Sequence, residues 1–102
     1  FDERTFFMYW EDTDLGFRLR DAGWQLAVAD HSRVWHKLSA SLGKRSKLLD
    51  EYFTRSGVRF FRRYAPVPWV SVSVMVGRML LKRLLIGELA RVRAVLRGLS
   101  EA

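Results

Sequence analysis

The chain has 102 residues, of which 49% are hydrophobic and 14% aromatic, so it is long and apolar enough to fold around a core. It contains no cysteine, which excludes disulfide bonds, thiolate metal sites and a cysteine nucleophile. The net charge of +7 is unevenly distributed, because residues 1–43 hold 5 basic and 7 acidic residues (net −2) whereas residues 44–102 hold 13 basic and 4 acidic residues (net +9). The basic second half suits a polyanion, either an anionic membrane face or nucleic acid.

An acidic cluster follows a run of bulky apolar residues near the N-terminus. Glu11, Asp12 and Asp14 come directly after the apolar residues 6–10. Carboxylates at the edge of an apolar wall lie where water is partly excluded and charge interactions are stronger, which makes this cluster a candidate site. The commoner role of such residues is to start a helix, and this alternative applies most to Asp14.

The first predicted element is a helix over residues 13–22, in which apolar residues recur at helical spacing. Gly23 follows as a helix terminator, and Asp12 or Thr13 is the expected N-cap.

Two short strands are predicted after this helix. Residues 24–29 alternate in strand fashion, residues 30–32 are typical of a turn, and residues 33–36 form the second strand. The polar stretch that follows, residues 37–46, is predicted to be a loop.

The second half is predicted to be helical. An apolar stripe predicts a helix from about Ser46 to Tyr64, which ends before Pro66. Residues 69–86 give a mixed signal, because alternating valines at the start favour a strand and the later residues favour a helix. We predict a helix throughout, since this half offers no partner strand. Residues 88–99 form a last, amphipathic helix.

Basic residues accompany these apolar stripes. Arg78, Lys82 and Arg83 interrupt the most apolar run, so no segment reaches the roughly 18 to 20 uninterrupted apolar residues that a membrane-spanning helix needs. The chain is therefore not expected to span a bilayer, but it can lie on one with its basic residues at anionic headgroups. A further basic stripe on the first helix of this half is most often a solvated face. Its members are Arg55, Arg59, Arg62 and Arg63.

Several short motifs form a combined pattern in the first half of the chain. They are Phe1-Asp2-Glu3, Phe6-Phe7-Met8-Tyr9, Glu11-Asp12-Thr13-Asp14-Leu15, Arg18-Leu19-Arg20, Ala22-Gly23-Trp24, and Arg33-Val34-Trp35-His36-Lys37 followed by Ser39-Ala40-Ser41. Together they resemble the C-terminal part of family 2 glycosyltransferases with the GT-A fold, and the rhamnosyltransferase-like branch is the most similar. The match continues less strictly through residues 52–55 and 60–66, so that it covers about the first two thirds of the chain.

The resemblance implies an α+β fold with two parts. Residues 1–43 would be the C-terminal, acceptor-side edge of a GT-A α/β domain, made of a helix and short strands. Residues 44–102 would be a predominantly helical, basic, amphipathic extension. The nucleotide-binding half, with its Asp-x-Asp metal motif, is expected upstream of Phe1, because the residues Asp12-Thr13-Asp14 match the acceptor-side acidic motif instead. Without that half the chain is not expected to be active.

The implied reaction is an inverting transfer of a sugar from a nucleotide-diphosphate donor to a hydroxyl of a glycan or lipid-linked acceptor, in cell-surface polysaccharide synthesis. Asp12 matches the general base that takes the proton of the acceptor hydroxyl as it attacks the anomeric carbon. Glu11 beside it would orient the acceptor or the base, and Trp10 would bind the acceptor. The implied location is cytoplasmic, on the inner face of the cell membrane.

The resemblance also implies a divalent metal, Mg²⁺ or Mn²⁺, which offsets charge on the leaving diphosphate. His36 matches a histidine that binds the metal or the diphosphate, although a purely structural histidine is an equally open alternative. A loop that closes over the diphosphate would contribute further contacts. Its residues are Lys37, Ser39 and Ser41.

A second class of function remains open, a non-catalytic basic helical module that binds anionic lipid or nucleic acid. Nucleic acid is the weaker choice, because Tyr52, Phe53 and Phe60 fall on the apolar stripe and not among the arginines, where they would stack on bases.

Overall fold

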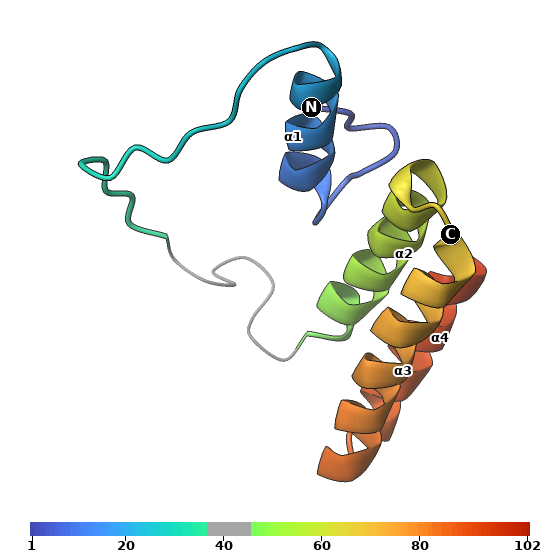
Figure 1. Ribbon diagram of the computed structural model, residues 1–102. Coiled ribbons are helices and arrows are strands. Elements are labelled where there is room, and N and C mark those ends of the chain that lie inside the picture. Colours follow the sequence, from blue (N-terminus) through green and yellow to red (C-terminus); the bar gives the residue numbers. More distant parts are fainter. Residues whose placement is uncertain (37–45) are drawn as a thin grey trace.

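The computed structural model describes residues 1–36 and 46–102 and is all-α within those ranges (Figure 1). Its helices are α1 (Glu11–Asp21), α2 (Lys47–Tyr64), α3 (Pro68–Ile86) and α4 (Leu89–Ser100). The described residues contain no strand, so the predicted α+β fold is wrong.

The error lies in residues 24–36, which were predicted as two strands. This segment runs away from the helices as an open loop (Figure 1), and Trp24, Leu26 and Val28 are exposed within it. A strand needs a neighbouring strand to satisfy its backbone N–H and C=O groups, and no other described segment supplies one. The predicted turn is present, because the Ser32 amide donates to the Ala29 carbonyl at 3.1 Å. The alternation of apolar and polar residues therefore did not indicate whether a partner strand was present.

Helix α1 begins two residues earlier than expected. Its N-cap is Trp10, and neither Asp12 nor Thr13 takes that position. The chain turns into the helix through two left-handed residues, Tyr9 (φ 66°) and Trp10 (φ 69°). At the other end Gly23 has φ 88°, a conformation that glycine adopts without strain, so the predicted terminator is confirmed.

The three predicted helices of the second half are confirmed. Ser46 caps α2, since its Oγ accepts a hydrogen bond from the Leu48 amide at 3.2 Å. Pro68 opens α3 at a position where a helix needs no backbone N–H. The alternating valines are accommodated by the helical period, which buries Val72 and Val76 four residues apart.

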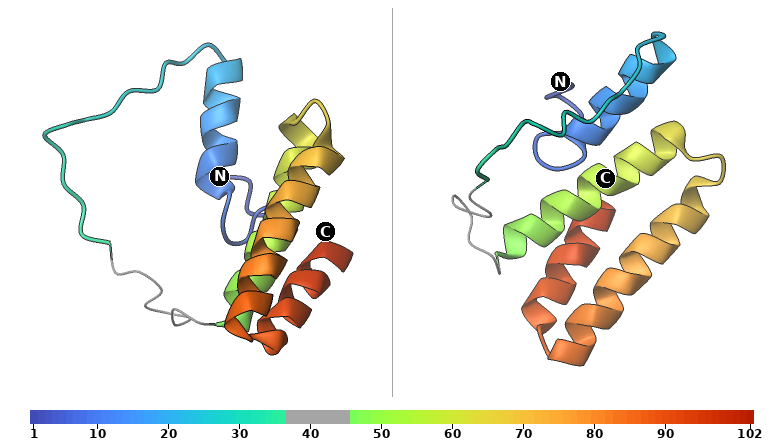
Figure 2. Two further views of the ribbon diagram at one scale, coloured as in Figure 1. Left: turned by 60° about the horizontal axis from the view of Figure 1, so that its bottom comes forward. Right: turned by 60° about the vertical axis from the view of Figure 1, so that its left-hand side comes forward.

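Helices α2, α3 and α4 pack side by side, and α1 lies on the side of α2 away from α4 (Figure 2). Four valines form the buried centre of this three-helix unit, with partly buried apolar residues from all three helices around them. They are Val58, Val72, Val76 and Val95. The described helices include none that is long and apolar enough to cross a membrane.

Glycines allow two close approaches to α2. A Cβ atom at Gly98 of α4 would collide with the carbonyl oxygen of Glu51. A Cβ atom at Gly57 of α2 would lie 2.6 Å from Met75 Sδ and 3.1 Å from Trp10 Nε1. Glycine therefore lets α4, α3 and the N-terminal turn contact the α2 backbone directly.

Candidate functional site

The first ten residues are fastened to α2 by side chains of that helix. Ser56 Oγ donates to the Met8 carbonyl at 2.9 Å, and Arg59 Nη1 donates to the Thr5 carbonyl at 2.9 Å. Phe6 is only 1% exposed. The turn that leads into α1 therefore has a fixed position on the α2 surface.

The arginine stripe of α2 does more than form a solvated face. Arg55 Nη1 bonds to a carboxylate oxygen of Glu101 at 3.0 Å, and Arg59 Nη2 reaches the Glu101 carbonyl at 3.4 Å. Arg63 contacts the N-terminal segment. These side chains hold both ends of the chain against α2.

Trp10 packs its ring into an aromatic cluster on α2. Its ring centroid lies 4.9 Å from that of Phe60, 5.3 Å from that of Phe61 and 5.5 Å from that of Phe53. The indole Nε1 is buried and has no hydrogen-bond partner among the described residues, and the same holds for Oε2 of the neighbouring Glu11. The acceptor-binding role predicted for Trp10 and Glu11 stays a prediction.

The backbone that presents the acidic cluster is strained. Left-handed φ values at Tyr9 and Trp10 cost about 1 to 3 kcal/mol each, because neither residue is glycine. The packing of Trp10 and the bond from Ser56 to Met8 stabilise the segment in spite of this cost. Strain of this kind concentrates at functional sites, which makes the start of α1 the best candidate site among the described residues.

Asp12 is exposed at this helix start. One of its carboxylate oxygens, Oδ1, accepts hydrogen bonds from the Thr13 amide at 2.7 Å and from the Thr13 hydroxyl at 3.3 Å. The N-terminus of a helix favours negative charge, and the exposed carboxylate is accessible to a ligand from solvent.

Asp14 lies two residues further along α1 and has the opposite environment. It is 0% exposed, and it accepts hydrogen bonds from Tyr64 Oη at 2.7 Å, Arg63 Nη1 at 2.8 Å and Arg18 Nε at 2.9 Å. Burial acts to raise the pKa of Asp14, but the three donors outweigh it and hold that pKa below its ordinary value. Asp14 is therefore an anchor that joins α1 to the C-terminal end of α2.

The pKa values of the groups around Asp14 are shifted as well. Burial, helped by the hydrogen bond to Asp14, raises the pKa of Tyr64, and the hydrogen bond to Asp14 raises the pKa of Arg63. Arg63 Nη1 also bonds to Asp2 Oδ2 at 3.1 Å. Hydrogen bonds from Thr5, and then the pairing with Arg63, lower the pKa of the Asp2 carboxyl.

Of the residues predicted to contact the metal or the diphosphate, the structure describes only His36. His36 is exposed at the end of the open segment, and three predicted loop contacts, Lys37, Ser39 and Ser41, lie outside the described residues. Within residues 1–36 and 46–102, no three His, Asp or Glu side chains come together in a way that could hold a metal ion. The described donors therefore do not by themselves form a site for Mg²⁺ or Mn²⁺.

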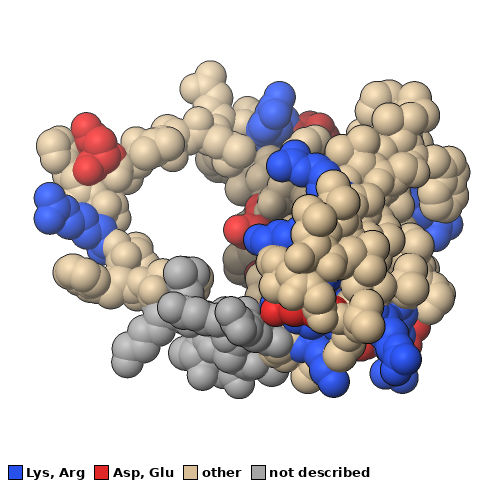
Figure 3. Space-filling view, turned by 90° about the horizontal axis from the view of Figure 1, so that it is seen from below, with Lys and Arg blue, Asp and Glu red and all other residues tan. Residues whose placement is uncertain are grey.

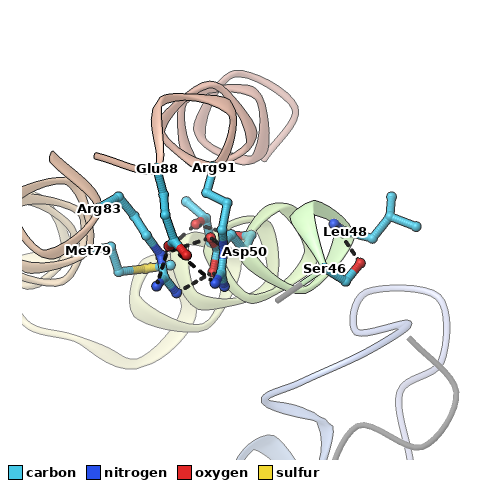
Figure 4. A network of polar contacts seen from close by, with 8 residues as sticks. Ser46, Leu48, Asp50, Met79, Arg83, Glu88 and Arg91 are labelled. Atoms are coloured by element: carbon cyan, nitrogen blue, oxygen red, sulfur yellow. Dashed lines mark hydrogen bonds and ion pairs between the residues drawn. The ribbon is translucent and has the colours of Figure 1, made fainter. Parts of the chain in front are cut away.

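The sequence did not predict a role for a second buried carboxylate, Asp50. Figure 4 shows Asp50 beside Arg83, Arg91 and Glu88. It accepts paired hydrogen bonds from Arg91, at 2.7 and 2.9 Å, and from Arg83, at 3.1 and 3.0 Å. Glu88 bonds to both guanidinium groups, at 3.1 and 3.4 Å. The sequence did contain a signal for this role, because Asp50 shares a helical face with Thr54 and Val58. A carboxylate on a buried face needs a cation as its partner.

An apolar groove runs between α2 and α3 and reaches the aromatic cluster. Its volume is about 540 Å³, and its lining includes Trp10, Phe61, Val70, Val74 and Arg78. The groove is therefore lined in part by the residue that precedes the acidic cluster.

Comparison of the chain with protein-family models, with curated proteins and with solved structures finds no match in any of the three.

Proposed function

We propose that this chain is the acceptor side of an inverting glycosyltransferase and that Asp12 is its general base. The observation that carries the proposal is the contrast between two neighbouring aspartates. Asp14 is buried and committed to three donors, whereas Asp12 is exposed on the same helix start. The motif resemblance independently selects Asp12.

In the proposed reaction, the acceptor hydroxyl donates a hydrogen bond to the Asp12 carboxylate. The hydroxyl oxygen attacks the anomeric carbon of the donor sugar from the face opposite the diphosphate, and its proton passes to Asp12. The bond from the anomeric carbon to the diphosphate breaks, and the diphosphate leaves with the electron pair. Glu11 and Trp10 orient the acceptor in this scheme.

The donor is proposed to be a nucleotide sugar and the acceptor a glycan or a lipid-linked glycan. A divalent cation, Mg²⁺ or Mn²⁺, would supply charge neutralisation at the leaving group, with His36 as its candidate contact and ligands from the nucleotide-binding half. Lys37, Ser39 and Ser41 are the proposed loop contacts.

We also propose that the chain works at the cytoplasmic face of the cell membrane. The support is electrostatic, because residues 44–102 carry a net charge of +9.

The test is Asp12→Asn in the protein that contains this chain together with its nucleotide-binding half. Turnover should fall by about 10²-fold or more, the usual range for loss of a general base. Donor binding and the midpoint of thermal unfolding should stay at their original values. Asp21→Asn is the matched control, because Asp21 is an exposed carboxylate on the same helix. Equal turnover of the Asp12→Asn and Asp21→Asn variants would exclude Asp12 as the base.

The second candidate function is a non-catalytic module that binds anionic lipid, which the basic charge of the second half favours. A nucleic-acid partner is less well supported, because Phe53 and Phe60 pack against Trp10 and do not present free faces for base stacking. If the Asp12→Asn variant retained all activities of the protein and lipid binding alone were measurable, the module would be the better assignment.

A further inference from the structure

Helix α3 is apolar on the side that faces solvent as well as on the side that faces the core. Its inner residues Val72 and Val76 are 4% and 7% exposed. An outward row along the helix consists of Val70 (60% exposed), Val74 (56%), Leu81 (59%) and Leu85 (79%). An exposed row of large apolar side chains along one face of a helix commonly marks an interaction site, so this outer face needs an occupant.

Basic residues border the outer face, and acidic residues are missing from it. Arg78 and Lys82 are exposed on α3, on the flank next to Val74, Leu81 and Leu85. Residues 52–87 contain no Asp or Glu at all. The first acidic residue after them, Glu88, is occupied by Arg83 and Arg91. In the view from below, broad uncharged areas of the helical part separate the Lys and Arg side chains (Figure 3).

We infer that the outer face of α3 docks on a bilayer that contains anionic lipid. In this arrangement α3 lies in the plane of the interface, its outward row enters the boundary between headgroups and acyl chains, and Arg78 and Lys82 meet lipid phosphates. The inference rests on the proposed membrane location and not on the transferase chemistry.

Charge favours a lipid surface over a second copy of the chain as the occupant. A symmetric pair of α3 faces would bring Arg78 and Lys82 of each copy near those of the other, with no acidic residue of α3 to neutralise them. Anionic headgroups supply the missing negative charge. Because Val70 and Val74 belong both to the outward row and to the α2–α3 groove, docking would also bring the groove and Trp10 close to the lipid surface.

The experiment measures co-sedimentation of the chain with vesicles of phosphatidylcholine alone and of phosphatidylcholine mixed with phosphatidylglycerol. Binding should be much stronger to the mixed vesicles and should fall as salt is raised from about 0.1 M toward 1 M, where the screening length drops from about 10 to about 3 Å. The double variant Arg78→Gln/Lys82→Gln should weaken binding to mixed vesicles about tenfold or more, since each basic residue near the surface contributes several-fold.

Matched controls come from the opposite, α2–α4 side of the bundle. Lys47→Gln/Arg93→Gln removes the same charge from residues that line a separate cavity on that side, and it should leave most of the binding intact. For the apolar row, Leu81→Ser/Leu85→Ser should weaken binding, whereas Leu48→Ser/Leu96→Ser should not, although Leu48 and Leu96 are also 45% and 47% exposed.

Three outcomes would overturn the inference. Equal binding to neutral and anionic vesicles would show that anionic headgroups do not attract the chain. Equal loss of binding in the Arg78→Gln/Lys82→Gln and Lys47→Gln/Arg93→Gln variants would show that the outer face of α3 is not the docking surface. A dimer in solution that Leu81→Ser/Leu85→Ser dissociates, with no vesicle binding by the wild-type chain, would assign the face to a second copy. None of these outcomes depends on Asp12, so the docking surface and the catalytic proposal fail separately.

Discussion

Two buried carboxylates, Asp14 and Asp50, hold the molecule together in different ways. Both are almost completely enclosed, at 0% and 4% exposed, and each contacts two arginine side chains. The arginine side chains on Asp14 are 44% and 37% exposed, whereas those on Asp50 are 15% and 9% exposed. Loss of the carboxylate would therefore leave water as an alternative partner at the Asp14 site but hardly at the Asp50 site.

The difference matches what each carboxylate joins. Asp50 connects α2 to Arg83 of α3 and Arg91 of α4, so it belongs to the three-helix unit itself. Asp14 connects α1 to Arg63 and Tyr64 at the end of α2, so it fastens the segment that carries the candidate site. We expect global unfolding to depend on Asp50 and local opening of the N-terminal segment to depend on Asp14.

The largest effect is expected for Asp50→Asn. The change leaves two nearly buried guanidinium groups with one remaining carboxylate, Glu88, and should lower the free energy of unfolding by about 3 to 5 kcal/mol. Urea unfolding followed by circular dichroism measures this loss. Glu51→Gln, one residue along α2, is the control and should stay within about 0.5 kcal/mol of wild type. A loss below about 1 kcal/mol for Asp50→Asn would show that the network contributes little.

A smaller effect is expected for Asp14→Asn. Arg18 and Arg63 regain water, so the loss should be about 1 to 3 kcal/mol, and it should concentrate in the N-terminal segment. Hydrogen exchange should show faster exchange in residues 1–21 and little change in α3. If α3 and α4 lost protection to the same degree, the Asp14 and Asp50 networks would belong to one cooperative unit. Asp14 would then not stabilise the N-terminal segment alone.

Acidification should weaken the stabilisation that Asp14 provides. Because the folded-state pKa of Asp14 is below its unfolded value, the stabilisation is fully present above the ordinary carboxyl range, near pH 4, and is lost as the pH falls through the folded value. Asp2, whose pKa is also lowered, acts in the same direction. Measured between about pH 5 and pH 2, the stability of the Asp14→Asn variant should fall less steeply than that of wild type. If the stability of the two proteins fell equally with pH, Asp14 would not be a source of the acid sensitivity.

The smallest effect on stability is expected for Asp12→Asn. Asp12 is exposed and bonds only to Thr13 in its immediate neighbourhood, so the unfolding free energy should stay within about 0.5 kcal/mol of wild type. Chemical denaturation at neutral pH gives the value. A loss as large as that of Asp14→Asn would indicate that Asp12 is a structural residue, and it would weaken its assignment as the base.

The sequence predicted local structure well and non-local structure poorly. Residues of one helix face recur within a few positions, so the helices α2, α3 and α4 could be read from periodicity. The strands predicted in residues 24–36 required a partner elsewhere in the chain, which alternation does not reveal.

The same reason explains why the roles of two carboxylates were missed. Asp14 meets Arg63 and Tyr64 across 49 and 50 residues, and Asp50 meets Arg83 and Arg91 across 33 and 41. Such pairs depend on how the helices pack. The exposed position of Asp12 agrees with its proposed role.

The close contact at Gly98 has a consequence for how this chain can vary. Small residues recur every fourth position along α4, at Ala90, Ala94 and Gly98, and Gly98 touches the α2 backbone. Any larger side chain at Gly98 would collide with the carbonyl oxygen of Glu51, whereas Ala90 and Ala94 border a cavity of about 400 Å³. A library of single substitutions should therefore be strongly depleted at Gly98 and permissive at the exposed residues Arg93 and Leu96, so that selection alone would reveal where α4 meets α2.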